Sequence, residues 1–187
     1  MSNLDLGNNQ FINYEFHENS KKPTILFSNS LGSDLNMWNP QVEFFKNDYQ
    51  LVLYDKRGHG KSSPIQGPYN FDMLENDVIS IMDELNITTA HFIGLSMGGM
   101  TSLGLALKYP DRFNKMVCCA ARADMPPPAI ESWDQRMAVV EEKGTEGVVQ
   151  GSIERWFSDE FRNDSSNSNI INKAEEMIKS TSVQGYI

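Results

Sequence analysis

The chain has few cysteines and histidines, no excess of basic residues and no long apolar run. Its 187 residues include two cysteines and three histidines, and 25 acidic against 16 basic residues give a formal net charge of -9. This balance disfavours nucleic acid as a partner, because lysine and arginine contacts to phosphate dominate such binding. No apolar stretch approaches the roughly 20 residues that span a bilayer, and residues 1–10 lack the apolar segment of a signal peptide. We therefore expect a cytoplasmic protein that binds neither membranes nor nucleic acid.

The two cysteines are neighbours, Cys118 and Cys119, within an apolar run at 116–121 that is typical of a buried strand. Consecutive side chains of a strand point to opposite faces of the sheet. We therefore expect two separate thiols that pack as small buried hydrophobic groups, rather than a reactive or bridging pair.

Apolar runs of strand length alternate along the chain with helical patterns. Strand-like segments lie at 11–16, 24–27, 51–54, 91–95 and 115–120, and the turn residues at 7–9 make the first of them part of a hairpin. Helical patterns lie at 38–45, 71–85 and 97–108. This alternation predicts an α/β fold, with a mostly parallel sheet, flanking helices on both faces and an active edge at the strands' carboxyl ends.

The character of the chain changes after Asp124. Three consecutive prolines, Pro126 to Pro128, open a tract with helical patterns at 130–142, 148–156 and 170–178 and without a strand signal. A polar stretch at 163–169 interrupts this tract, and we expect it to be an exposed loop. We interpret residues 1–124 as the N-terminal part of the core and residues 125–187 as a helical cap, or lid.

The most informative local motif is Gly94-Leu95-Ser96-Met97-Gly98, which falls where an expected strand ends and an expected helix begins. A sharp turn there would hold Ser96 in strained backbone geometry and present its hydroxyl at the top of the sheet. The glycines remove side chains that would clash where the strand and the helix converge. Ser96 is therefore the candidate nucleophile, and an aspartate nucleophile is excluded.

Two backbone N–H groups are candidates for an oxyanion hole. That of Met97 lies at the start of the expected helix, where unsatisfied donors and the helix dipole stabilise negative charge. The second is that of Leu31, in the segment Ser28-Asn29-Ser30-Leu31-Gly32 that follows a buried strand. The alternative for this segment is an ordinary turn rich in small polar residues.

Four motifs together resemble the α/β-hydrolase superfamily, and most of all its 3-oxoadipate enol-lactonases. They are Asn29-Ser30-Leu31-Gly32, Trp38, the run Tyr-Asp-Lys-Arg-Gly-His-Gly-Lys-Ser at 54–62, and Gly94-Leu95-Ser96-Met97-Gly98-Gly99-Met100. Asn29-Ser30 stands where many relatives have His-Gly, and this feature favours the enol-lactonases over generic esterases. In the cap, Trp133-Asp134-Gln135-Arg136 and Arg155-Trp156-Phe157 are also similar to that subfamily.

This resemblance implies hydrolysis of 3-oxoadipate enol-lactone, a step of aromatic catabolism through the β-ketoadipate pathway. Ser96 would attack the lactone carbonyl, a histidine would accept its proton and water would release the acid, without a metal or an organic cofactor. The partner would be a small carboxylated lactone or ester. Since arginine grips a carboxylate through two parallel hydrogen bonds, Arg122 and Arg136 are candidate substrate contacts, together with Ser30 and Trp133.

A catalytic acid and a catalytic histidine are missing from the expected part of the sequence. In this fold the order along the chain is serine, then aspartate or glutamate, then histidine. His17, His59 and His91 all precede Ser96, and Asp124, the one later acid near a strand end, is not assigned. We therefore expect a fragment of a longer protein that lacks the closing C-terminal strands and has very low activity alone.

Two other functions fit the same residues. Another serine hydrolase of this fold, such as a carboxylesterase or a perhydrolase-like relative, would differ mainly in the lining of its pocket. A protein that keeps the fold without the triad would act by binding alone. The sequence makes no prediction of the oligomeric state.

Overall fold

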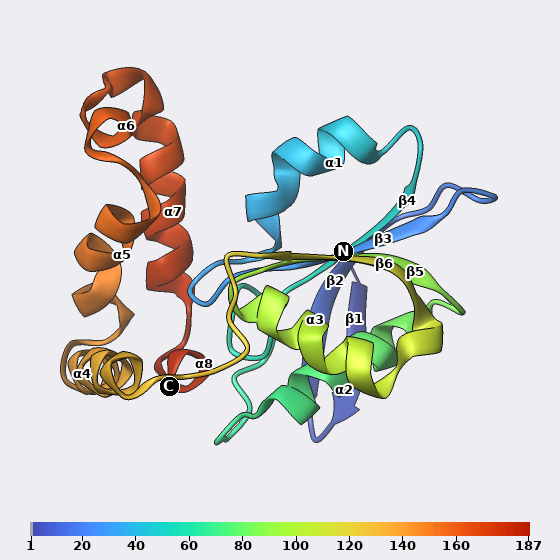
Figure 1. Ribbon diagram of the computed structural model, residues 1–187, viewed down its shortest axis with the longest axis horizontal. Coiled ribbons are helices and arrows are strands. Elements are labelled where there is room, and N and C mark those ends of the chain that lie inside the picture. The colour runs from blue at the N-terminus through green and yellow to red at the C-terminus, as the bar shows by residue number, and fades with distance from the viewer. Residues whose placement is uncertain (1) are drawn as a thin grey trace.

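A computed structural model describes residues 2–187 as a six-stranded sheet with helices on both faces and a group of helices beyond one end (Figure 1). The strands are β1 (Ser2–Gly7), β2 (Gln10–His17), β3 (Thr24–Ser28), β4 (Gln50–Tyr54), β5 (Ala90–Leu95) and β6 (Phe113–Cys119), and their spatial order is β1-β2-β4-β3-β5-β6. β1 and β2 form an antiparallel hairpin, and β2 is antiparallel to β4, whereas β4, β3, β5 and β6 are parallel to one another. The predicted hairpin and the mostly parallel sheet are confirmed.

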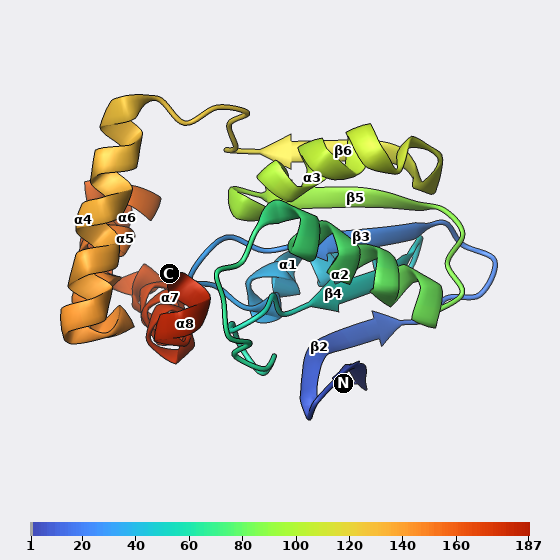
Figure 2. The same ribbon diagram turned by 90° about the horizontal axis from the view of Figure 1, so that it is seen from below.

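Helices cover both faces of this sheet (Figures 1 and 2). One face carries η1 (Leu35–Trp38) and α1 (Asn39–Phe45), and the other carries α2 (Phe71–Glu84) and α3 (Met97–Lys108), with the short η2 (Pro110–Arg112) after α3. Asn70 caps α2, since its side chain accepts a hydrogen bond from the N–H of Met73. No helix among residues 2–187 has the length and the apolar character needed to cross a membrane.

Alternating side chains of the inner strands form two apolar cores, one on each face of the sheet. Leu26 of β3 packs toward α2 and α3, in a buried cluster with Val52, Val78, Phe92 and Leu105. Its neighbours Ile25 and Phe27 pack toward α1, in a cluster with Leu35, Trp38, Val42, Leu51 and Leu53. A strand that is covered on both faces reads as a continuous apolar run, which is why these strands were predictable.

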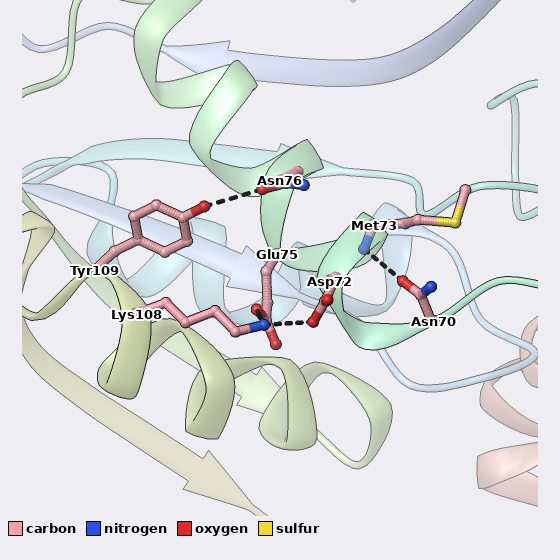
Figure 3. Close-up of polar contacts among 7 residues, drawn as sticks. All are labelled: Asn70, Asp72, Met73, Glu75, Asn76, Lys108 and Tyr109. Atoms are coloured by element: carbon pink, nitrogen blue, oxygen red, sulfur yellow. Dashed lines mark hydrogen bonds and ion pairs between the residues drawn. The ribbon is translucent and has the colours of Figure 1, made fainter.

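Polar contacts between α2 and α3 hold the second of these helices in place (Figure 3). The Lys108 ammonium group forms ion pairs with Asp72 and with Glu75, the latter at 2.6 Å. Glu75 is buried against Gly104, where an added methyl group would lie 1.8 Å from the Glu75 Oε1 atom. These contacts therefore tie α3, the helix that begins directly after Ser96, to α2.

The remaining helices lie beyond the carboxyl ends of the parallel strands (Figure 2). They are α4 (Pro127–Lys143), η3 (Thr145–Val148), α5 (Val149–Trp156), α6 (Asp159–Asn163), η4 (Ser165–Asn167), α7 (Ser168–Ser180) and α8 (Val183–Tyr186). Their buried side chains form an apolar cluster of their own, made of Val140, Val148, Val149, Ile153, Ala174, Ile178 and Tyr186. A separate core is what a distinct packing unit needs, and we propose residues 125–187 as such a unit, called the cap below.

The last helix of the cap docks on the turn that follows β4. The backbone N–H and the hydroxyl of Ser182 both donate to the carbonyl oxygen of Gly58, at 2.9 Å and 3.0 Å. A methyl group added at Gly185 would lie 2.5 Å from the same oxygen, and one added at Gly58 would lie 2.4 Å from the Cα atom of Gly185. The two backbones therefore touch at a point where neither residue can carry a side chain.

Of the exposed loop predicted at 163–169, the exposure is confirmed, but the loop is wrong. α6 ends at Asn163, η4 covers Ser165–Asn167 and α7 begins at Ser168. The Asp164 side chain accepts a hydrogen bond from the N–H of Ser166 at 2.9 Å and caps η4. The polar residues that suggested a loop are thus residues that also begin short helices.

The prediction of two buried cysteines is also wrong. Cys118 is exposed and Cys119 is partly exposed, and both are free thiols. β6 lies at the edge of the sheet, and within the described residues it pairs with β5 alone. An apolar run predicts a strand, but only the neighbouring elements decide whether that strand is covered.

Candidate active site

Ser96 lies between β5 and α3 in the sharp turn that its motif predicts. Its backbone angles are φ 54° and ψ −112°, a conformation that a residue with a side chain adopts only when the surrounding structure enforces it. The Ser96 N–H donates to the carbonyl oxygen of Cys119, and its own carbonyl oxygen accepts from the N–H of Met100, both at 2.8 Å. Neighbouring strand and helix thus hold the serine in place, and the residue remains partly exposed.

Two glycines let this turn, the elbow at residues 94–98, pack closely. A methyl group added at Gly94 would lie 2.2 Å from the carbonyl oxygen of Gly98. One added at Gly98 would lie 2.1 Å from the carbonyl oxygen of Ser28, the last residue of β3. Both obstacles are backbone atoms, so only glycine fits at these two positions. The second contact also brings the elbow against the strand that leads into the other oxyanion candidate.

Hydrogen bonds between side chains and backbone close the segment after β3, called the β3 loop (residues 29–33). The Asn29 side chain donates to the carbonyl oxygen of Ser33, and the Ser33 hydroxyl donates to that of Ser30, both at 2.9 Å. The loop is therefore a tight turn of small polar residues. Within residues 2–187 the N–H groups of Leu31 and Met97 donate to no backbone acceptor, so both remain candidates for the oxyanion hole.

A buried lysine holds the start of the β3 loop by hydrogen bonds. Lys56 follows β4 and is fully buried, and its ammonium group donates to the Ser28 hydroxyl at 2.8 Å and to the Asn29 carbonyl oxygen. The same group lies 5.4 Å from the centre of the Tyr54 ring. Burial lowers the pKa of Lys56 to about 7, although the nearby Asp55 carboxylate acts in the opposite direction. The sequence analysis assigned no role to Lys56. Its position soon after a buried strand could have indicated that the lysine is buried and structural.

Asp55 and His59 organise the turn after β4. The Asp55 carboxylate accepts hydrogen bonds from the N–H groups of Leu35 and Lys61 and from the Asn13 side chain, at 2.8 to 2.9 Å. His59 is buried, and its Nδ1 atom lies 2.9 Å from the carbonyl oxygen of Arg57. Burial lowers the pKa of His59 to about 4, so the ring is neutral near pH 7. Both side chains are engaged with this turn and not with Ser96.

None of the described residues 2–187 provides a histidine that is hydrogen-bonded to the Ser96 hydroxyl. His91 lies near the opposite end of β5. It is five residues from Ser96, which is about 16 Å along an extended strand. His17 lies at the end of β2, 3.6 Å from the Glu15 carboxylate. The Asp124 carboxylate is 84% exposed and lies 3.8 Å from Arg122.

The predicted substrate contacts fall in separate parts of the structure. Ser30 is buried in the β3 loop, and its neighbour Leu31 packs against the apolar cluster of the cap. Trp133 and Arg136 lie about one turn apart on α4, with the Arg136 guanidinium 3.9 Å from the centre of the Trp133 ring. Arg122 pairs instead with Asp124 on the exposed linker between β6 and α4. The structure thus brings the β3 loop and the cap together.

A surface cavity of about 210 Å³ lies away from Ser96, beside Asp55. Asn13, Asp34, Leu35, Asn36, Gly60, Lys61 and Ser180 line the rest of it. No group of three or more histidine, cysteine, aspartate or glutamate side chains within residues 2–187 is placed to hold a metal ion.

Comparisons with known proteins agree with this geometry. Residues 23–183 match the family model of the alpha/beta hydrolase fold. 3-Oxoadipate enol-lactonase 2 of Acinetobacter baylyi is 38% identical over 175 residues, which cover 94% of this chain and 64% of that protein. 3-Oxoadipate enol-lactonase 1 of the same organism is 41% identical over 164 residues, covering 88% and 60%.

A solved structure of an enol-lactonase is also similar to this chain. The crystal structure of the enol-lactonase from Burkholderia xenovorans LB400 matches with a TM-score of 0.89 and 32% identity, over 96% of this chain and 68% of that one. The chain thus spans less than two thirds of the length of the two Acinetobacter relatives. The likeness to enol-lactonases that the motifs indicated is confirmed, and the chain belongs to the alpha/beta hydrolase fold family.

Proposed function

We propose that this chain provides the nucleophile of a hydrolase that cleaves a carboxylic ester or lactone, with 3-oxoadipate enol-lactone as its substrate. The observation that carries the proposal is Ser96, held in a strained turn between β5 and α3. The likeness to two 3-oxoadipate enol-lactonases supports the choice of substrate.

In the proposed reaction the Ser96 hydroxyl attacks the lactone carbonyl, and the ring C–O bond then breaks. The carbonyl oxygen carries negative charge in the tetrahedral intermediate, where the N–H groups of Leu31 and Met97 stabilise it, aided by the start of α3. The departing enolate takes up a proton and becomes a ketone, and water hydrolyses the acyl-Ser96 ester to the acid. Loss of one such oxyanion donor slows serine hydrolases by about 100- to 1,000-fold.

A general base and an acid are still required, because Ser96 must lose its proton as it attacks. We propose that both belong to the part of the longer relatives that this chain does not match, in the order serine, acid, histidine. The 187 residues alone would then show only the residual catalysis that the oxyanion hole and substrate binding supply.

The proposed binding residues are Ser30 in the β3 loop and Trp133 and Arg136 on α4. Leu31 of the loop packs against the cap cluster, so these residues flank the junction of loop and cap. Arg122, also a candidate from the sequence, would have to leave Asp124, with which its guanidinium pairs on an exposed linker.

Loss of enol-lactone absorbance tests the proposal, with the chain as given and with a version that is extended to its natural stop codon. The extended protein should hydrolyse the lactone, Ser96→Ala should abolish turnover, and Ser180→Ala, a change of an exposed serine, should leave it intact. Turnover of simple aryl esters without turnover of the lactone would favour a carboxylesterase. Turnover that survives Ser96→Ala would refute the assignment of Ser96 as the nucleophile. Ser96-dependent turnover by the 187 residues alone would refute the proposal that the general base lies outside them.

A further inference from the structure

Two arginines of the cap form no ion pair with any acidic residue that the structure describes. The chain has six arginines, and Arg57, Arg112, Arg122 and Arg162 each form an ion pair. Arg136 on α4 and Arg155 on α5 are not within 4.0 Å of any carboxylate among residues 2–187. In a chain with 25 acidic residues, two guanidinium groups without a carboxylate in ion-pair range mark a place where an anion would be stabilised.

Neutral neighbours hold each of these guanidinium groups. Arg136 donates to the Ser132 hydroxyl at 3.2 Å and stacks over the Trp133 ring. Arg155 donates to the buried Ser152 hydroxyl at 2.9 Å. A guanidinium group carries five N–H donors, so these contacts orient both arginines and leave most donors unused.

Tyr186 of α8 connects the two arginines. Its side chain is buried, which raises the pKa of its hydroxyl, and the nearby positive charges of Arg136 and Arg155 act in the opposite direction. Burial lowers the pKa of Arg155, and the charge of Arg136 lowers it further, so the two cations are close enough to repel each other. Glu154 acts in the opposite direction, but its carboxylate accepts a hydrogen bond from Gln150 at 2.7 Å.

This cluster lies where the cap meets the β3 loop. A methyl group added at Gly32 would lie 3.9 Å from the Trp156 ring and 4.0 Å from the Tyr186 ring. Gly32 directly follows Leu31, the proposed second oxyanion donor. In Figure 2, α4 and α8 lie beyond the ends toward which the parallel strands run. A ligand with its carbonyl group at the oxyanion site would therefore extend toward the arginines.

We propose that Arg136, Arg155 and the Tyr186 hydroxyl bind a free carboxylate of the substrate, and so select a lactone or ester that carries a second acidic group. A carboxylate can accept two parallel hydrogen bonds from one guanidinium group, while the second guanidinium adds charge. The proposal rests on the proposed function. It adds Arg155 and Tyr186 to the binding residues and leaves Arg122 outside them.

Binding can be tested without catalysis. The chain is titrated with hexanoate, and tryptophan fluorescence is recorded, because Trp133 and Trp156 lie beside the cluster. Hexanamide serves as the neutral probe of the same shape. Hexanoate should bind saturably and hexanamide should not, since only the carboxylate can accept charge-assisted hydrogen bonds from the two guanidinium groups.

Substitutions assign that binding to the cluster. Arg136→Gln and Arg155→Gln should each raise the Kd for hexanoate at least about 10-fold, and Tyr186→Phe should raise it several-fold. Arg162→Gln changes a cap arginine that has an ion pair and should leave the Kd unchanged. Unchanged affinity in Arg155→Gln, or an equal loss in Arg162→Gln, would overturn the proposal, provided that circular dichroism shows each variant to be folded.

Measurements on the extended protein distinguish carboxylate binding by the cluster from hydrolysis at Ser96. There, Arg155→Gln should raise KM for the lactone and leave the hydrolysis of a neutral aryl acetate intact, whereas Ser96→Ala should abolish both reactions. Carboxylate binding without turnover would leave the cluster standing and refute the proposed function. Turnover that is indifferent to Arg155→Gln would refute the cluster alone.

Discussion

The buried Lys56 beneath the β3 loop predicts an unusual dependence of stability on pH. Burial lowers the pKa of this lysine to about 7 in the folded chain, whereas an ordinary lysine titrates near 10.5. Between these two values the unfolded state keeps a proton that the folded state has lost, so the free energy of unfolding rises with pH. Below about pH 7 Lys56 is protonated in both the folded and the unfolded state, and the buried charge lowers the free energy of unfolding by its full amount.

Lys56→Met removes the titrating group and keeps an unbranched side chain that can fill the space. Each pH unit between the two pKa values corresponds to about 1.4 kcal/mol. From near pH 7 to near pH 9 the wild type should therefore gain about 2 kcal/mol relative to the variant. The variant also leaves the Asn29 carbonyl oxygen without its lysine donor, which costs about 1–3 kcal/mol at any pH. The change with pH, rather than the absolute difference, thus reports on the buried charge.

Urea unfolding followed by far-ultraviolet circular dichroism measures this change. Lys115→Met, a change of an exposed lysine on β6, is the matched control. The stability difference between this control and the wild type should stay constant between the two pH values. A constant difference for Lys56→Met as well would refute the lowered pKa of Lys56.

Three further substitutions test contacts around the site. Gly98→Ala places a methyl group 2.1 Å from a backbone oxygen at the end of β3, so the elbow must shift, and urea unfolding should show a loss of about 1–3 kcal/mol. Asp77→Asn breaks a pair in which the Nε and Nη2 atoms of Arg57 each lie 2.6 Å from an oxygen of the buried carboxylate. The expected loss is about 3–5 kcal/mol, and a variant as stable as the wild type would contradict a desolvated pair. Gly185→Ala should separate α8 from the turn after β4, seen as faster amide exchange at Ser182; unchanged exchange would speak against the tight contact.

Local signals in the sequence were enough for most of the core. The runs at 24–27 and 51–54 read as buried strands because helices cover both of their faces. The elbow was predictable because glycine at 94 and 98 follows from steric clashes with backbone atoms. Where a pattern reflects the backbone and its immediate surroundings, the sequence therefore suffices.

Features that depend on distant neighbours were missed. The apolar run around Cys118 predicted a strand, but not its place at the sheet edge. The role of Lys56 depends on Asn29, which is 27 residues away. Arg136 and Arg155 lie on different helices, and only the packing of the cap brings their charges close together.

The contact of α8 with Gly58 restricts how the cap can open. The cap is joined to the core covalently at the linker after β6 and by backbone contact at α8. A swing of the whole cap about that linker would first have to break both hydrogen bonds from Ser182. α6 lies far from both attachments (Figure 1). Because Leu31 and Gly32 also contact the cap near α5 and α7, opening motions are expected to be local bending around α6, while α8 stays fixed.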